Sequence, residues 1–83
     1  MLNIKVLGSG CANCKRLEQL ARQVVDELGV EAEVVKVTDP TKYADYGVMS
    51  TPGLVVNEKT VSSGRIPSIP EITSFVTTAL TTN

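Results

Sequence analysis

The segment LNIKVLGSGCANCKR, residues 2–16, joins two kinds of hydrophobic periodicity. Leu2 to Leu7 partly alternates apolar and polar residues and ends at Gly8, as a short strand does. From Lys15 onward apolar residues recur at helical spacing, in the stripe Leu17, Leu20, Ala21, Val24 and Leu28. We therefore predict a strand, a turn at Gly8, and a helix that ends at Gly29.

The middle of the chain predicts a second strand and a shorter helix. Ala32 to Val37, AEVVKV, is short and rich in β-branched residues, which favour strands. Asp39 can cap a helix and Pro40 can occupy its first position, so a short helix or turn is expected up to Gly47. A strand, a crossover helix and a second strand imply a parallel pair with a right-handed connection.

The last third of the chain predicts a hairpin and a third helix. GLVV (residues 53–56) and TVSS (residues 60–63) are short strands on either side of NEK. Ser68 and Glu71 have the spacing of a helix capping box, and an apolar stripe follows, made of Ile72, Phe75, Val76, Ala79 and Leu80. The predicted fold class is α/β, with the order β-α-β-α-β-β-α and a four-stranded mixed sheet flanked by three helices. We expect one domain over residues 1–83, since so short a chain builds a single core.

The composition excludes several classes of function. The chain has a formal net charge of −1 and no histidine, so neither a Ser-His-Asp nor a Cys-His nucleophile system can be built from it. The low net charge gives no general attraction to nucleic acid or to anionic membranes. No stretch approaches the roughly 18 apolar residues of a membrane helix, and no secretory signal is visible. We expect a cytoplasmic protein with neither nucleic acid nor membrane as a partner.

Both cysteines of the chain, Cys11 and Cys14, fall between the first strand and the first helix. In a reducing compartment, two nearby cysteines are more often catalytic or metal-binding than structural. Cys11 is expected at the helix tip, where free N–H groups and the helix dipole favour a thiolate and lower the thiol pKa from about 8.5 toward roughly 7. Cys14 continues the apolar stripe inward. An exposed attacking thiolate and a shielded resolving thiol suit disulfide exchange.

The neighbours of the cysteines are expected to support this site. Lys15 adds positive charge, and Ala12 and Asn13 separate the two thiols. Gly8 and Gly10 are expected to let the chain turn from strand to helix at positive φ. A second local signal, STPG at residues 50–53, precedes a predicted strand and taken alone indicates an ordinary turn.

The two signals together resemble the thioredoxin superfamily. A C-x-x-C between the first strand and the first helix is followed about forty residues later by Thr51-Pro52 at the start of a strand. The chain looks most like the small, glutaredoxin-sized thioredoxin-like redox proteins, and the resemblance covers nearly its whole length. It implies that Cys11 attacks, that Cys14 resolves, and that Pro52 is the cis-proline facing the disulfide. Thr51 would offer its backbone to an extended substrate chain.

The implied function is that of a thiol–disulfide oxidoreductase without a cofactor. It would reduce or exchange disulfides in partner proteins and be recharged by a thioredoxin-reductase-like electron donor; we expect a monomer. The chain departs from the family's best-known pattern at three places. Gly10 stands where tryptophan precedes the first cysteine, Ala12-Asn13 replaces Gly-Pro, and Lys5 lies nearest the place of a buried carboxylate. No glutathione signature follows downstream, so dependence on glutathione is not supported.

Two alternatives remain open from the sequence. GSGCANC also resembles the Gly-Met-x-Cys-x-x-Cys loop of heavy-metal-associated domains, and two thiolates suit Cu(I). That class has the order β-α-β-β-α-β and no role for STPG. Zinc would need two further ligands, hence a dimer that shares two cysteine pairs; we assign no metal ligand in the chain itself. The other alternative is a non-catalytic domain whose cysteines are merely small apolar residues.

Overall fold

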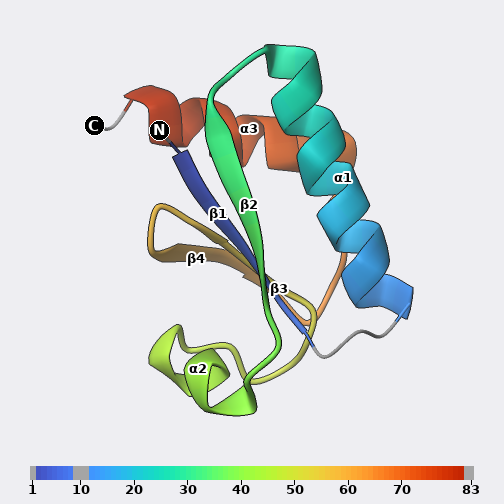
Figure 1. Cartoon of the computed structure of the whole chain (residues 1–83), viewed down its shortest axis with the longest axis vertical. Helices are drawn as coiled ribbons and strands as arrows, with labels where there is room; N and C mark the ends of the chain where they lie inside the picture. Colours follow the sequence, from blue (N-terminus) through green and yellow to red (C-terminus); the bar gives the residue numbers. More distant parts are fainter. Residues whose placement is uncertain (1, 9–11, 82–83) are drawn as a thin grey trace.

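The computed structural model describes residues 2–8 and 12–81. The predicted order of elements is confirmed (Figure 1). In chain order the elements are β1 (Leu2–Leu7), α1 (Ala12–Leu28), β2 (Ala32–Val37), α2 (Pro40–Asp45), β3 (Gly53–Val56), β4 (Lys59–Ser63) and α3 (Ile69–Thr81).

The four strands form one mixed sheet in the order β2-β1-β3-β4. β1 runs parallel to β2 and antiparallel to β3, and β3 and β4 form the expected hairpin. The hairpin turn is tighter than the sequence suggests, because Val56 pairs with Lys59 and only two residues lie between them. Those residues, Asn57 and Glu58, have φ of 51° and 67°, and positive φ at both central positions matches the twist of a two-residue hairpin. β4 therefore begins one residue earlier than predicted.

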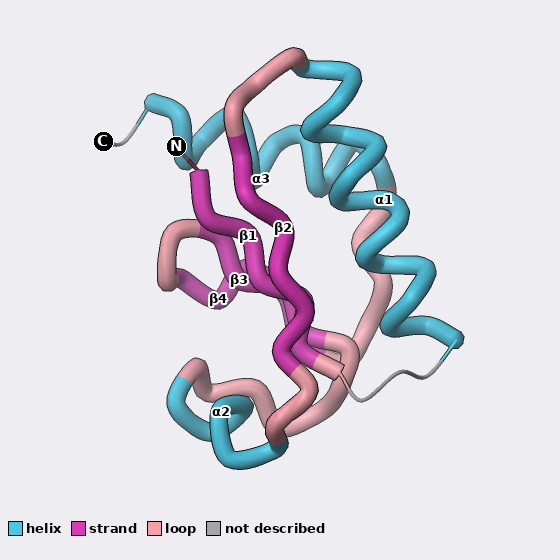
Figure 2. Tube along the Cα trace, in the orientation of Figure 1, coloured by secondary structure: helices cyan, strands magenta, loops and turns pink. Residues whose placement is uncertain are grey.

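Helices cover both faces of the sheet (Figure 2). Alternate residues of β1 point to opposite faces, so Ile4 and Val6 join the larger core cluster beneath α1 and α3. Leu7 points the other way and packs with Val48 and Val55 in a smaller cluster beside α2. α2 thus lies across the sheet from α1 and α3.

Two residues of the predicted apolar stripes do not belong to the core. Leu28, in the last turn of α1, is 40% exposed, and Leu80, near the end of α3, is 44% exposed. Leu17, in the same stripe as Leu28, is by contrast fully buried in the larger core cluster. None of the helices within residues 12–81 is long and apolar enough to cross a membrane.

The predicted helix boundaries rest on local chemistry. α1 is followed by Gly29 at φ +65°, a conformation that costs glycine little. The Asp39 side chain accepts a hydrogen bond from the Thr41 N–H and so caps α2, with Pro40 in the first turn. The Thr41 hydroxyl and N–H bond the Asp39 carboxylate and hold its pKa below the ordinary value.

Candidate functional site

Cys14 lies in the first turns of α1 and points toward the sheet. Its side chain is 4% exposed and disulfide-bonded, while the predicted supporting residues Ala12, Asn13 and Lys15 are exposed around it. The prediction that Cys14 continues the buried stripe is confirmed. Cys11 and Gly10, which were expected to complete the site, lie outside the described residues.

Gly8, at the end of β1, lies directly beneath Cys14. A Cβ placed on Gly8 would overlap the Cys14 Sγ and lie 2.9 Å from the Cys14 Cβ. The expectation that Gly8 serves a turn at positive φ is wrong, because its φ is not among the positive values found at Gly29, Gly47 and Gly64. Glycine is required at position 8 for a different reason, because α1 and the end of β1 approach each other too closely there to leave room for a methyl group.

Thr51 and Pro52 come to the same place from the far side of the sheet. The peptide bond between them is cis. Pro52 is buried and Thr51 is exposed, and the Thr51 Cβ would lie 3.9 Å from a Cβ on Gly8. The end of β1 and the first turns of α1 therefore meet the start of β3, which follows about forty residues later in the chain.

Backbone hydrogen bonds hold these segments at one end of the two central strands, β1 and β3. The Gly8 N–H donates to the Val37 carbonyl at 3.0 Å, which extends the pairing of β1 with β2. The Gly64 N–H donates to the Pro52 carbonyl, also at 3.0 Å, and ties the end of β4 to the cis-proline. The segments that pack against Cys14 are consequently held by the hydrogen bonds of the sheet.

Comparison with known proteins identifies this arrangement. A family model described as "Thioredoxin domain" matches residues 2–77. The chain belongs to the thioredoxin family. Thioredoxins are thiol–disulfide oxidoreductases, and both the family and the fold implied by the sequence resemblance are therefore confirmed.

Individual thioredoxins show how much of the chain is shared. A thioredoxin of Methanocaldococcus jannaschii is 40% identical over 72 residues, which cover 87% of this chain and 83% of the relative. A thioredoxin of Methanothermobacter thermautotrophicus is also 40% identical over 72 residues, with 87% and 94% covered. The structure of thioredoxin 1 from Thermosipho africanus TCF52B superposes with a TM-score of 0.63 at 20% identity, over 94% of this chain and 93% of that one. That last likeness supports the fold.

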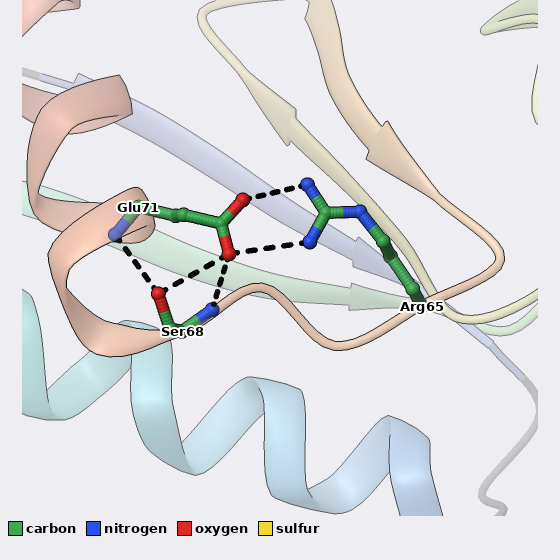
Figure 3. A network of polar contacts seen from close by, with 3 residues as sticks. All are labelled: Arg65, Ser68 and Glu71. Carbon is green, nitrogen blue, oxygen red and sulfur yellow. Dashed lines mark hydrogen bonds and ion pairs between the residues drawn. The ribbon is translucent and has the colours of Figure 1, made fainter.

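An ion pair between Arg65 and Glu71 follows the end of β4 in this thioredoxin-family protein (Figure 3). Arg65 follows Gly64 and donates to Glu71, with Nη2 to Oε2 at 2.7 Å. The predicted capping box is present, since the Ser68 N–H donates to Glu71 Oε1 at 3.0 Å and the Ser68 Oγ accepts from the Glu71 N–H at 3.4 Å. The hydrogen bond from Arg65, followed by those from Ser68, lowers the Glu71 pKa to about 2.

Lys5 does not take the place of a buried carboxylate beside Cys14. It lies on the α2 side of the sheet, where its ammonium donates to the Tyr46 hydroxyl at 2.7 Å and to Glu58. Tyr46 in turn donates to Glu58 at 2.8 Å. The hydrogen bond with Glu58 raises the Lys5 pKa and the same bond lowers the Glu58 pKa. This network, which sequence reasoning missed, fastens the end of α2 to the β3–β4 turn.

The segment between α2 and Thr51 carries an exposed apolar residue. Met49 is 97% exposed, two residues before Thr51. It borders a groove of about 550 Å³ whose other lining residues are Pro40, Tyr43, Ala44, Gly47 and Val48. Hydrophobic periodicity could not reveal this exposure, because a single methionine in a loop has no pattern around it.

Proposed function

We propose that the protein is a thiol–disulfide oxidoreductase whose redox couple is Cys11 and Cys14. The observation that carries the proposal is the disulfide-bonded, 4% exposed Cys14, which lies against Gly8 where Thr51 of the cis Thr51-Pro52 bond also approaches. The chain contains one other cysteine, Cys11, three residues earlier. Membership of the thioredoxin family supports the same chemistry.

The reaction transfers two electrons from the Cys11–Cys14 dithiol to a disulfide in a partner protein. The Cys11 thiolate attacks one sulfur of the substrate disulfide, so a mixed disulfide forms and the other substrate sulfur leaves as a thiolate. Cys14 then gives its proton to solvent and attacks the Cys11 sulfur. The Cys11–Cys14 bond forms, the second substrate thiolate leaves with the electron pair, and the protein is oxidised while the substrate is reduced.

The proposed roles of the two cysteines follow from where they stand. Cys14 is shielded and lies over Gly8, which suits a thiol that acts only within the mixed disulfide. Cys14 lies in the first turns of α1, a 17-residue helix without an acidic residue in its first turn. Unpaired backbone N–H groups and the positive end of the helix dipole are therefore near the thiols. Lys15, exposed beside Cys14, adds a positive charge.

Thr51 and Pro52 are proposed as the docking site for the substrate chain. Thr51 is exposed beside the buried Pro52, which suits a residue whose backbone pairs with an extended segment in the manner of an added strand. We propose disulfide-containing proteins as the substrates and a thioredoxin-reductase-like donor as the source of electrons. The cytoplasmic location and the monomeric state stay predictions.

The order of elements argues against the metal-binding alternative. The heavy-metal-associated domain places its hairpin directly after the second strand, whereas α2 intervenes here between β2 and β3. No observation among the described residues favours Cu(I) or zinc over disulfide exchange.

A redox titration of the purified, metal-free protein tests the proposed function. The protein is equilibrated in thiol/disulfide buffers of graded potential, free thiols are trapped by alkylation, and the mass shift reports the reduced fraction. A single two-electron transition between roughly −180 and −300 mV, the span of cellular dithiol systems, is the expected result. Failure to form the intramolecular disulfide anywhere in this span would overturn the proposal.

Two variants separate the roles of the cysteines. Cys11→Ser removes the attacking thiolate and should abolish reduction of a disulfide substrate such as insulin. Cys14→Ser keeps the attack but removes the resolving thiol, so mixed disulfides with substrate should accumulate and be visible on a non-reducing gel. Identical behaviour of the two variants would contradict the assignment of attacking and resolving roles.

A further inference from the structure

Gly8 leaves a space that the Cys14 side chain occupies. Its missing Cβ would overlap the Cys14 Sγ, and the distance of 2.9 Å to the Cys14 Cβ means that rotating the sulfur away would not relieve the contact completely. Nonbonded carbon atoms prefer separations of about 3.5–4.0 Å. A methyl group at residue 8 therefore requires the Cys14 side chain, or the helix or strand behind the contact, to move.

Neither side of this contact is free to move easily. The Gly8 N–H is bonded to the Val37 carbonyl at 3.0 Å, which holds the end of β1 in the sheet. On the other side, Leu17 and Ala21 are fully buried and hold the Cys14 face of α1 on the core. Because the backbone on both sides is held, most of the displacement would fall on Cys14.

We propose that Gly8 is a positioning residue for the resolving step, since its lack of a side chain provides the seat from which the Cys14 sulfur attacks the mixed disulfide. This inference rests on the proposed function. It goes beyond it by assigning a role to a residue that contributes no reactive atom. The step it serves is the one in which the Cys14 thiolate bonds to the Cys11 sulfur and the substrate sulfur leaves as a thiolate.

The structure also sets the direction of the effect on the redox equilibrium. In the oxidised protein the Cys14 Sγ is held in its disulfide, at the site that a Gly8 methyl group would overlap. In the reduced protein the sulfur can rotate about the Cα–Cβ bond and avoid part of the overlap. A methyl group at residue 8 therefore disfavours the disulfide more than the dithiol, and the protein becomes a stronger oxidant.

The experiment compares Gly8→Ala with the wild type and with Gly29→Ala. Gly29→Ala adds the same methyl group after the far end of α1, where nothing lies within 4 Å and the cost comes from φ +65°. It controls for loss of stability without contact with Cys14. Each protein is titrated in thiol/disulfide buffers, and the lifetime of the mixed disulfide with a small aromatic disulfide is measured by stopped flow.

We expect Gly8→Ala to shift the equilibrium constant toward the dithiol at least tenfold, which is about 30 mV for a two-electron couple. The mixed disulfide should persist at least tenfold longer, while the rate of its formation by Cys11 changes less than threefold. Gly29→Ala should leave all three quantities within twofold of the wild type. Equal shifts in the two variants, or an unchanged lifetime in Gly8→Ala, would overturn the inference.

A double-mutant cycle keeps the proposal testable even if Gly8→Ala folds poorly. Under reducing conditions, Gly8→Ala is compared in the wild-type and Cys14→Ala backgrounds, since Cys14→Ala removes the sulfur that the methyl group would overlap. The loss of melting temperature caused by Gly8→Ala should fall by at least half in the Cys14→Ala background; an equal loss in both backgrounds would overturn the inference. If the wild type itself shows no dithiol transition, the proposed function fails, while the cycle still reports whether Gly8 seats Cys14.

Discussion

Leu17 and Leu28 belong to the same helical stripe of α1, yet truncating them should have very different effects. Leu17 is fully buried in the larger core cluster, whereas Leu28 is 40% exposed. Leu17→Ala removes a buried isobutyl group and leaves a cavity between α1 and the sheet, and such substitutions cost about 2.7–5.0 kcal/mol. Leu28→Ala removes apolar area that is partly in water and opens no enclosed cavity, so we expect less than about 1 kcal/mol.

The size of the protein makes this difference easy to measure. At roughly 0.05–0.15 kcal/mol per residue, a chain of 83 residues has an unfolding free energy of about 4–12 kcal/mol. Leu17→Ala should therefore remove about a fifth of the total or more. With a urea m-value of about 1 kcal/mol/M for a domain of this size, the midpoint should fall by about 3–5 M for Leu17→Ala and by less than about 1 M for Leu28→Ala.

Urea unfolding followed by far-ultraviolet circular dichroism checks this prediction on oxidised protein at one temperature. Both substitutions exchange leucine for alanine in the same helix, so the change in intrinsic helix propensity is small and nearly the same in each. The m-values should agree among the three proteins if each unfolds in two states. Equal midpoint shifts for the two variants would refute the argument that burial under the core, rather than position in the stripe, sets the cost.

Three further predictions concern the ends of the helices. Folding lowers the Glu71 pKa from 4.5 to about 2, so the ionised Glu71 stabilises the folded protein fully above about pH 4.5 and progressively less as the pH falls toward 2. The melting temperature of Glu71→Gln should therefore drop less than that of the wild type across that range. Ser68→Ala removes the cap of α3 and should cost about 1 kcal/mol, a loss of about 4–8 °C in melting temperature, whereas the exposed mid-helix Ser74→Ala should not lower it. Gly29→Ala should cost about 1 kcal/mol at φ +65°, and Gly29→Asn should cost less in the same thermal melts, because asparagine tolerates that conformation.

Much of the fold could be predicted because its signals are local. The capping box at Ser68 and Glu71, the Asp39–Pro40 helix start and the glycine after α1 each satisfy backbone groups within a few residues. The apolar periodicities could be interpreted in the same way, since the strand and helix periods differ. The hairpin turn is one residue tighter than the residue types predict, because Asn57 and Glu58 both have positive φ.

Local sequence patterns are enough to predict the order of elements, the placement of Cys14 on the buried face of α1, and the pairing of a C-x-x-C with a Thr-Pro at a strand start. These depend on neighbours along the chain and on the resemblance they carry. The roles of Cys11 as the attacking residue and of Gly10 beside it stay predictions, because both positions lie outside the described residues.

The contacts between elements, in contrast, depend on how the layers of the folded protein pack. This packing placed Gly8 under the Cys14 sulfur, directed Lys5 away to Tyr46 and Glu58, and left Leu28 partly in water although its spacing matches that of Leu17. Each outcome depends on how closely one element packs against another. Periodicity says which face of an element is apolar, but how closely that face approaches its neighbour is settled only when the layers pack.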